Sequence, residues 1–315
     1  MGEAGGPRLT RLLIDTDTAS DDAVALLMAL RAEAASIVAI TVVAGNVPLP
    51  QAIQNALYAR DLVDGTAPVY AGRAGPRVGE LRTAQFVHGE DGMGDIGLEL
   101  SGREPDDGDA VDVLIDTIRA EPGGLTLVTL GPLTNVAEAF ERAPDVAAKL
   151  DRLVLMGGAA DAVGNMTAVA EFNVWADPEA ARIVFGSGAP IEMVGWDISR
   201  KYAAFDDDEQ QALRTLGPLG EFAVDTQATL NAWARENTGL PGFDYPDPIA
   251  MAVALDPSVA TSTRRLHVDV ETSGELTRGQ TVVDHLRITE QAPNADVVLE
   301  ASRARFLELL RDALR

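Results

Sequence analysis

The segment LLIDTDTASDD at residues 12–22, followed by a helical apolar pattern from Ala23, is the strongest constraint on the fold. The apolar run at its start predicts a short buried strand, and the pattern after it predicts a helix. The four aspartates of the segment therefore lie where a strand ends and a helix begins. Open α/β sheets bind their ligands at such points.

Helix capping accounts for only part of this acidity. Ser, Thr and Asp cap helices, and acidic side chains are favoured at the positive end of the helix dipole. Carboxylates this close together would also raise one another's pKa values unless a cation neutralised them. No Cys or His is nearby, and oxygen ligands favour a hard ion, Ca²⁺ or Mg²⁺, over zinc. We therefore expect a metal or catalytic site in this segment.

Composition excludes several other classes of site. The 315 residues include 25 basic and 49 acidic side chains, and the net charge of −24 argues against a nucleic-acid partner. Without cysteine, the chain can form neither a disulfide nor a zinc–thiolate site. No apolar run approaches the roughly 18 residues of a membrane span, and residues 1–8 lack a signal-peptide core. We expect a cytoplasmic protein with no membrane partner, a flexible tail over residues 1–8 and one domain over residues 9–315.

Strand-like runs alternate with helical ones along the chain. Strands are predicted at residues 9–14, 37–44, 69–70, 125–130, 153–156, 191–194 and 297–299, with an antiparallel pair at 268–270 and 280–283. Helices are predicted at residues 20–33, 50–64, 111–120, 135–142, 178–185, 206–216, 220–235, 248–254 and 304–314. This alternation predicts an α/β domain with a mainly parallel, mixed sheet covered by helices on both faces. The Gly-rich segment 73–108 is too long for an idle connection and predicts a functional loop.

Polar groups recur where the predicted strands end. Asn46 follows the second strand, and the Gly-Pro after Leu130 turns the chain away from regular pairing, which would leave the Leu130 carbonyl free. Further polar residues follow later strands or open a helix, namely Asn165, Glu171, Asn173 and Asp247. If the sheet is parallel, these ends converge on one crevice.

Taken in order, these motifs resemble the nucleoside hydrolase family, of the inosine-uridine-preferring kind. The matching segments are Asp15 to Asp22, Gly45-Asn46, Gly131 to Asn135, Met156 to Gly158, Glu171 to Asn173, Asp177 to Ala180 and Val270 to Thr281. The likeness covers about residues 9–314. It implies a Rossmann-like nucleoside hydrolase fold, with a catalytic domain over residues 9–315 that splits a ribonucleoside into ribose and a free purine or pyrimidine base. It also implies a homo-oligomer, a tetramer or dimer.

The resemblance implies a metal site and a general base. One Ca²⁺ would be bound by Asp17, Asp22, the Leu130 carbonyl and Asp247. Asp15 would orient these ligands from behind, and Asp21 would take a proton from a water held by the ion. Calcium would bring this water and the sugar hydroxyls together and make the water more acidic.

The substrate contacts implied by the resemblance are Asn46, Met156, Asn165, Glu171, Phe172 and Asn173. The three asparagines and Glu171 would bind ribose hydroxyls, and Met156 and Phe172 would pack against the sugar and base. Cleavage of an N-glycosidic bond passes through an oxocarbenium-like sugar, for which carboxylates and amide oxygens are favourable neighbours.

One position departs from the family pattern. Many members have His-Asp where this chain has Pro246-Asp247, and that histidine is held to help the base leave as an acid. Proline cannot do so. Candidates for the leaving-group or base contact are His88, Trp233, Arg235 and Tyr245, and the sequence does not choose among them. We expect Trp196 to be a core residue.

Two other functions compete with hydrolysis. A ribose- or nucleoside-binding protein with little turnover would keep the metal and sugar residues but lack a leaving-group acid, as Pro246 suggests. Asp15-Thr16-Asp17 after an apolar strand also resembles the nucleophile motif of aspartate-based phosphatases. That motif usually has Thr or Val where this chain has Ala19, which makes the phosphatase the weaker alternative.

Overall fold

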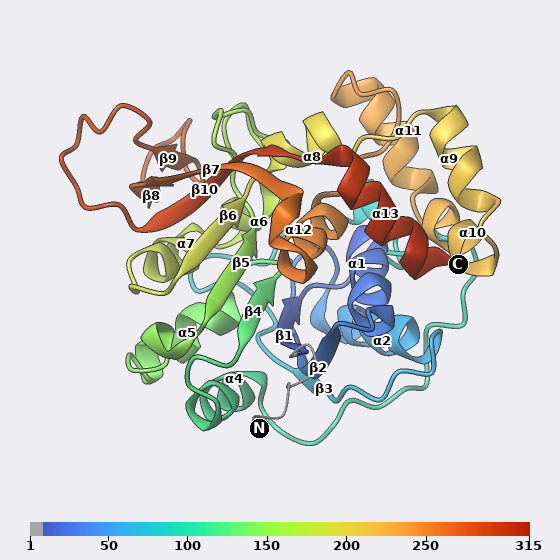
Figure 1. The fold of residues 1–315 in the computed structure, drawn as a ribbon, viewed down its shortest axis with the longest axis horizontal. Coiled ribbons are helices and arrows are strands. Elements are labelled where there is room, and N and C mark those ends of the chain that lie inside the picture. The colour runs from blue at the N-terminus through green and yellow to red at the C-terminus, as the bar shows by residue number, and fades with distance from the viewer. Residues whose placement is uncertain (1–8) are drawn as a thin grey trace, which may run out of the picture.

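The computed structural model describes residues 9–315, so the predicted tail over residues 1–8 lies outside the described part. At its centre is a sheet with the strand order β3-β2-β1-β4-β5-β6-β10-β7 (Figure 1). Its strands are β1 (Thr10–Thr16), β2 (Ala35–Val42), β3 (Val69–Ala71), β4 (Thr126–Thr129), β5 (Arg152–Met156), β6 (Ile191–Val194), β7 (Ala260–Leu266) and β10 (Ala295–Ala301). Neighbouring strands are parallel except β10 and β7. The predicted mainly parallel, mixed sheet is confirmed.

The direction of strand addition reverses between β1 and β4. From β1 the chain adds β2 and β3 on one side and then crosses to β4, β5 and β6 on the other. Such a reversal leaves a crevice at the carboxyl ends of the two central strands. Because β1 ends at Thr16 and β4 ends at Thr129, the segments that follow them begin at this crevice.

Successive side chains of β1 enter two different cores. Leu12 and Ile14 belong to one apolar cluster and Leu13 to the other, as expected from the alternation of side chains along a strand. All three are fully buried. A strand buried on both faces needs a continuous apolar run rather than an alternating one, which is why the LLI run formed such a clear signal.

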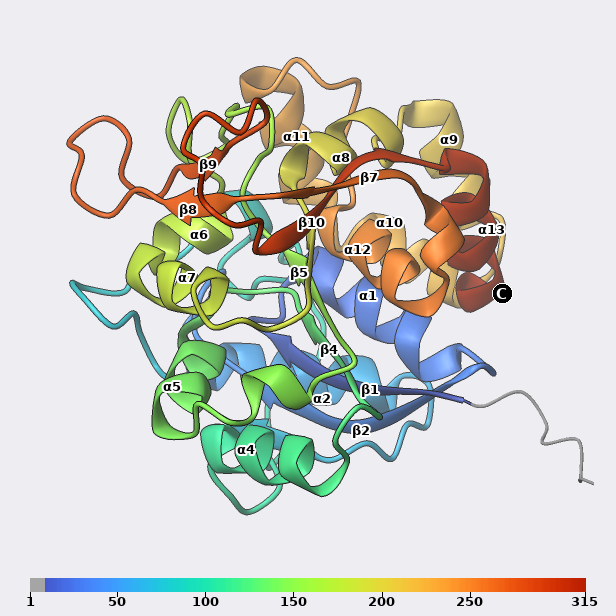
Figure 2. The ribbon, with the colours of Figure 1, turned by 60° about the vertical axis from the view of Figure 1, so that its left-hand side comes forward.

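Helices cover both faces of the sheet (Figure 2). One face is covered by α1 (Ser20–Arg31), α2 (Leu49–Asp61), α12 (Pro246–Leu255) and α13 (Arg303–Leu314). The other is covered by α4 (Ala110–Ala120), α5 (Thr134–Arg142) and α7 (Pro178–Phe185). The other helical segments are α3 (Gln85–His88), η1 (Ala147–Lys149), α6 (Phe172–Ala176), α8 (Trp196–Tyr202), α9 (Asp207–Arg214), α10 (Pro218–Asp225), α11 (Ala228–Asn237) and η2 (Pro257–Val259). The predicted antiparallel pair is confirmed as β8 (Val268–Val270) with β9 (Thr281–Val283).

The prediction of one helix over residues 220–235 is wrong. The chain forms two helices here, α10 and α11, with a break at Thr226 and Gln227. Both of these side chains are fully buried, and the Thr226 hydroxyl donates to the Phe222 carbonyl at 3.0 Å. Thr and Gln side chains that bond locally compete with the helical pattern, and the apolar periodicity of the sequence does not reveal that competition.

Strand β7 was missed for a different reason. It is an edge strand whose central residues, Ser262 to Arg265, are mostly exposed and polar. An edge strand of this kind lacks the apolar signal on which strand prediction depends. In the described part of the chain, no helix is long and apolar enough to cross a membrane.

Candidate active site

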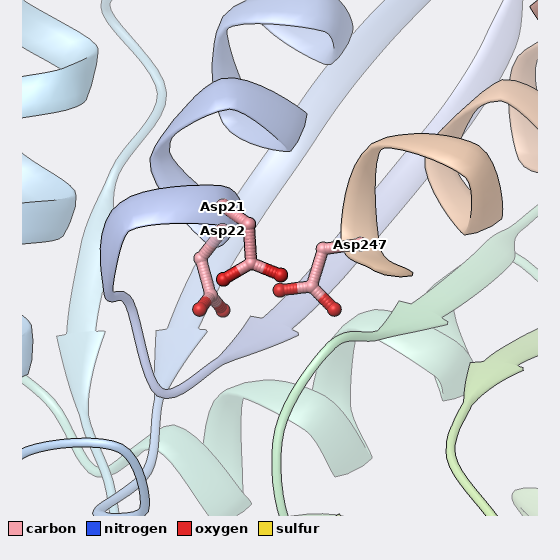
Figure 3. A group of neighbouring side chains, drawn as sticks. All are labelled: Asp21, Asp22 and Asp247. Carbon is pink, nitrogen blue, oxygen red and sulfur yellow. The ribbon is translucent and has the colours of Figure 1, made fainter. Parts of the chain in front are cut away.

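The reversal point of the sheet gathers carboxylates from three places in the chain. Asp15 is within β1, Asp21 and Asp22 are in the first turn of α1, and Asp247 is in the first turn of α12. Figure 3 shows Asp21, Asp22 and Asp247 directed toward one another from the ends of these two helices. One carboxylate oxygen from each of the three lies within 4.8 Å of the others, a grouping that could hold a metal ion.

Several oxygens of this cluster have no protein partner. Among the described residues, Asp15 Oδ2, Asp17 Oδ1 and Asp21 Oδ1 are buried and accept no hydrogen bond. Buried polar atoms in native proteins are nearly always paired. Three buried, unpaired carboxylate oxygens within one short segment of the chain favour a cation that completes the site.

The carboxylate of Asp17 is held by the backbone around it. Its Oδ2 accepts the Asn46 N–H at 2.6 Å. A Cβ added at Gly45 would lie 2.1 Å from Asp17 Oδ2, and one added at Gly131 would lie 2.6 Å from Oδ1. Only glycine leaves room for the carboxylate at these two positions. This explains the glycines of the Gly45-Asn46 and Gly131 to Asn135 motifs.

Asp22 is also fixed by direct bonds. Its Oδ1 accepts the Thr16 hydroxyl at 2.6 Å, and its Oδ2 accepts the Ala19 N–H at 3.0 Å and the Asn46 amide at 3.3 Å. Asn46 therefore bonds both Asp17 and Asp22 and fixes the two carboxylates relative to one another.

Asp15 lies behind the cluster. Its Oδ1 accepts the Thr41 hydroxyl at 2.6 Å and the Asn135 amide at 2.8 Å. Asn135 also donates to the Val42 carbonyl at 3.2 Å. These bonds join the ends of β1 and β2 to the start of α5, so Asp15 braces the strand end that carries Asp17.

Burial and mutual repulsion raise the pKa values of the clustered acids. For Asp17, Asp21 and Asp247, burial raises the pKa well above its usual value, and the charge of Asp22 raises it further. Burial also raises the pKa of Asp22 itself and that of Asp15, to about 7. Because the charged forms are disfavoured in this way, a bound cation is the simplest means of keeping the cluster ionised at neutral pH.

The Leu130 carbonyl is not left wholly free. It accepts the Asn173 amide at 2.8 Å, and the same amide lies 3.3 Å from the Met156 carbonyl. A carbonyl oxygen has two lone pairs, so one remains for a further ligand. Asn173 thereby ties the ends of β4 and β5 together beside the acids.

Next to the cluster lies a cavity that is open to solvent and encloses about 620 Å³ of empty space, part of it at the open mouth. It is lined by Asp21, Asn46, Ala84, Val87, His88, Leu130, Met156, Asn165, Met166, Glu171, Phe172, Asn173, Trp196, Leu230, Trp233, Asp244, Pro246 and Asp247. The structure thus brings together the predicted substrate contacts Asn46, Met156, Asn165, Glu171, Phe172 and Asn173. The segment 73–108 contributes the α3 residues Val87 and His88, together with Ala84.

Glu171 is a buried acid that caps α6. Its Oε2 accepts the Gly158 N–H at 2.7 Å and its Oε1 accepts the Asn173 N–H at 2.9 Å. Burial raises its pKa to about 7. Asn165 closes the same turn by accepting the Phe172 N–H at 2.9 Å.

His88 belongs to a chain of buried side chains behind the cavity. Its Nδ1 lies 2.9 Å from the Ser20 hydroxyl, which donates to Gln227 Oε1 at 2.9 Å. The same Nδ1 is 3.9 Å from Asp21 Oδ1. Burial lowers the pKa of His88 to about 4.

The sequence model of the inosine-uridine preferring nucleoside hydrolases matches residues 12–308. The chain belongs to this nucleoside hydrolase family. It is 37% identical over 307 residues to the pyrimidine-specific ribonucleoside hydrolase RihA of Escherichia coli K12, covering 96% of this chain and 98% of the relative.

Solved nucleoside hydrolases share the whole fold. The plant nucleoside hydrolase PpNRh1 superposes with a TM-score of 0.89 at 34% identity, covering 98% of this chain and 99% of its own. The purine-preferring ribonucleoside hydrolase from Gardnerella vaginalis gives a TM-score of 0.89 at 32% identity, covering 97% and 98%. The predicted family, the single α/β domain and the N-glycosyl hydrolase class are confirmed.

Two predicted base contacts of this nucleoside hydrolase are not at the cavity. Tyr245 is fully buried and donates its hydroxyl to the Ala223 carbonyl at 2.6 Å. Arg235 lies on the exposed side of α11, where it bonds Asn231 at 3.4 Å and pairs with Asp207 at 2.5 Å. Tyr245 lies just before α12 and Arg235 lies in α11. Tertiary packing sets the direction of each side chain, and the neighbouring residues in the sequence do not reveal it.

Trp196 and Asp244 are among the cavity residues that were not predicted. Trp196, expected in the core, is 5% exposed and is both a core residue and part of the cavity wall. Asp244 also lines the cavity and is 4% exposed. The available signal was its place just before the Tyr-Pro-Asp that opens α12, because acids at the start of a buried helix need partners.

Proposed function

We propose that this nucleoside hydrolase cleaves the N-glycosidic bond of ribonucleosides with the help of Ca²⁺, releasing ribose and a free base. The observation that supports this most is the group of buried acids at the reversal point, which borders directly on the cavity. A binding protein would need the cavity but not a carboxylate such as Asp21 in its wall.

The donor set fits a calcium ion. We assign the ion to carboxylates of Asp17, Asp22 and Asp247 and to the remaining lone pair of the Leu130 carbonyl, because all are oxygen donors, as Ca²⁺ prefers. The three acids closest to one another include Asp21 and not Asp17, but Asp21 lines the cavity, where the general base is needed, and Asp17 does not. When bound, the ion would orient and acidify the attacking water and hold the sugar diol.

Asp21 is positioned to be the general base. Its side chain is part of the cavity wall, where the carboxylate can take a proton from a water that attacks C1′ of the ribose. We name the surrounding wall the sugar side of the cavity and define it as Asp21, Asn46, Glu171, Asn173 and Asp247. Its amide and carboxylate oxygens suit ribose hydroxyls and the positive charge that develops on the sugar.

We assign the base to a second group of lining residues, here called the base side and defined as His88, Trp196, Leu230, Trp233 and Asp244. Its aromatic and aliphatic surfaces suit a flat heterocycle. The named relatives include both pyrimidine-specific and purine-preferring enzymes. We therefore propose ribonucleosides as the substrate class without restriction to one kind of base.

A direct assay tests the proposal. The protein is incubated with Ca²⁺ and a panel of purine and pyrimidine ribonucleosides plus p-nitrophenyl riboside, and reducing sugar is measured. We expect ribose to be released from at least one nucleoside, activity to disappear in a chelator and activity to return with added Ca²⁺. Mg²⁺ and Zn²⁺ in place of Ca²⁺ test the choice of ion.

The alternatives give different outcomes in the same assay. Tight ribose binding without cleavage of any riboside would favour a binding protein, and release of phosphate from sugar phosphates would favour a phosphatase. By family resemblance we also propose a cytoplasmic homo-oligomer, a tetramer or dimer, which light scattering of the purified protein would test.

A further inference from the structure

The base side contains an acid to which neither the resemblance nor the comparisons give a role. We propose that Asp244 is the catalytic residue that protonates the departing base, the task for which this chain has no histidine at position 246. The inference rests on the proposed hydrolysis and adds the missing acid to it. Pro246 itself is at the first turn of α12 and offers the substrate no proton.

Asp244 lies where such an acid is needed. Its side chain is part of the cavity wall and is 4% exposed. It precedes Asp247 by three residues but is outside the three-carboxylate group that could hold a metal. Trp196, Leu230 and Trp233 line the same cavity, and with Asp244 they are the residues that we assign to the base.

Ser199 of α8 holds this carboxyl in place. Its hydroxyl donates to Asp244 Oδ2 at 2.6 Å, and it also lies 3.0 Å from the Trp196 carbonyl. The second acceptor matters because the hydroxyl can remain satisfied when Asp244 changes protonation state. In the neutral acid, Oδ2 still accepts from Ser199 while the proton is on the other oxygen.

The charges around Asp244 set its proton affinity. Burial raises the pKa of Asp244 to about 6, against the lowering effect of the hydrogen bonds from Ser199 and Trp196 and of the Arg200 charge. Arg200 lies over the Trp196 ring at 4.7 Å.

Other titratable groups also face the cavity. The negative charge of Asp244 helps raise the pKa of Asp21, so the two acids act on each other electrostatically. The remaining titratable residues of the cavity wall are His88 of α3, Glu171 at the start of α6 and Asp247 of α12. Two carboxyls in one site with different surroundings are the usual basis for dividing acid and base roles.

The hydrogen bonds of His88 argue against that residue as the acid. The Thr226 hydroxyl donates to the Phe222 carbonyl, so its oxygen accepts from Gln227 Nε2 at 3.2 Å. This orients the amide so that Oε1 accepts a hydrogen bond from the Ser20 hydroxyl, and the Ser20 oxygen then accepts a hydrogen bond from His88 Nδ1–H. Neutral His88 therefore has its proton on Nδ1, directed away from the substrate, and a bare Nε2 that can only accept.

The proposed step balances without a further reactant. The carboxyl of Asp244 gives its proton to a ring nitrogen or carbonyl oxygen of the base as the electron pair of the C1′–N bond moves onto the base. A water oxygen bonds to C1′ and its proton passes to Asp21. After release of ribose and the neutral base, Asp21 loses a proton to solvent and Asp244 regains one, so the overall reaction converts nucleoside and water into ribose and base.

The test compares two leaving groups in Asp244→Asn. Asparagine preserves the size of the side chain and can still accept from Ser199, but it cannot donate a carboxyl proton. We expect kcat for a ribonucleoside to fall by about 10²–10³, the usual range for a lost general acid. The loss with p-nitrophenyl riboside should be at least tenfold smaller, because p-nitrophenolate leaves without protonation. A difference of less than tenfold between the two losses would overturn the proposal.

The pH profile gives a second readout. In the wild type, kcat for the nucleoside should fall as pH rises through about 6, where Asp244 ionises, and this basic limb should be absent in Asp244→Asn. Ser199→Ala removes a bond that lowers the pKa of Asp244, so its basic limb should move to higher pH. If Asp244→Asn does not fold, as judged by its melting curve, the pH profile of Ser199→Ala is the deciding test. A basic limb at the same pH as in the wild type would refute Asp244 as the acid.

His88→Gln is the competing variant. It should lose no more activity with the nucleoside than with p-nitrophenyl riboside, and a tenfold larger loss with the nucleoside would make His88 the acid instead. Failure of the wild type to hydrolyse either riboside would refute the proposed function itself. If the wild type is active but Asp244→Asn loses the same factor of activity with the nucleoside and with p-nitrophenyl riboside, only the role of Asp244 is refuted.

Discussion

The sugar side and the base side of the cavity are built from different parts of the fold. Sugar-side residues follow strand ends or occupy the first turn of a helix at the reversal point, as Asn46 follows β2 and Asp21 begins α1. Base-side residues come from α3, α8 and α11 and from the turn before α12. The chemistry common to all ribosides thus depends on the sheet, whereas the contacts that can differ between bases depend on helices at its edge.

The largest effect should come from the sugar side. In Asp21→Ala we expect kcat to fall by about 10³–10⁴ for every riboside, including p-nitrophenyl riboside, because all need the same activated water. Calcium affinity, measured by calorimetry, should be retained because the proposed ligands remain. An unchanged rate, or loss of calcium binding that accounts for the whole defect, would show that the base is elsewhere.

The sugar side should also contribute to the pH dependence of stability. Burial raises the pKa of Glu171 from 4.5 to about 7 in the folded state. Its contribution to stability is therefore full below about pH 4.5 and is lost as pH rises toward 7 and above.

Glu171→Gln has no such titration and serves as the reference. The free energy of unfolding of the wild type relative to this variant should fall by roughly 3 kcal/mol between pH 4 and 8. Urea unfolding at several pH values in a chelator measures the difference. If the free energy of unfolding of the wild type relative to Glu171→Gln stays constant or increases with rising pH, Glu171 is ionised without a free-energy penalty.

A backbone change can separate metal binding from the cavity. Gly45→Ala would place a methyl 2.1 Å from Asp17 Oδ2 and displace that carboxylate. We expect calcium affinity to fall by about 10–100-fold, as when supporting residues of a metal site are changed. Gly75→Ala is the matched control, because its methyl would meet its nearest neighbour, Leu81, at 3.8 Å. Equal affinities in the two variants would contradict the position assigned to Asp17.

The smallest effect among these variants should come from Trp233 on the base side. Trp233 lines the cavity and contacts Phe86 edge to face, with ring centroids 6.4 Å apart. In Trp233→Ala we expect KM for nucleosides to rise about tenfold, the low end for a lost aromatic stack on a base. Inhibition by free ribose should not change. A parallel loss of ribose affinity would place Trp233 against the sugar and weaken the division between the two sides.

Sequence reasoning located the sugar side and most of the fold because their signals are local. A buried strand followed by acids in a helical first turn is visible in residues 12–22 alone. Gly45 and Gly131, which lie against Asp17, belong to short motifs that are also visible in the sequence. The structure added the contacts that explain those motifs, such as Asn46 bonding both Asp17 and Asp22.

The base side was harder to predict because its residues meet only through tertiary packing. A buried tryptophan such as Trp196 has the same sequence context whether or not it borders a cavity. Tyr245 and Asp244 are adjacent, yet the first donates its hydroxyl to Ala223 and the second faces the cavity. No periodic pattern distinguishes such neighbours in a turn between helices.

The ligand set proposed for calcium has a mechanical consequence. Asp17 and Asp22 are near one end of the chain, Asp247 is near the other, and α1 packs directly on α12. An ion shared by these residues would act as a removable cross-link between the first and last thirds of the molecule. Its removal should therefore loosen the first turns of α1 and α12 together, which hydrogen exchange would register as faster amide exchange at both helix starts and little change at the opposite end of the sheet.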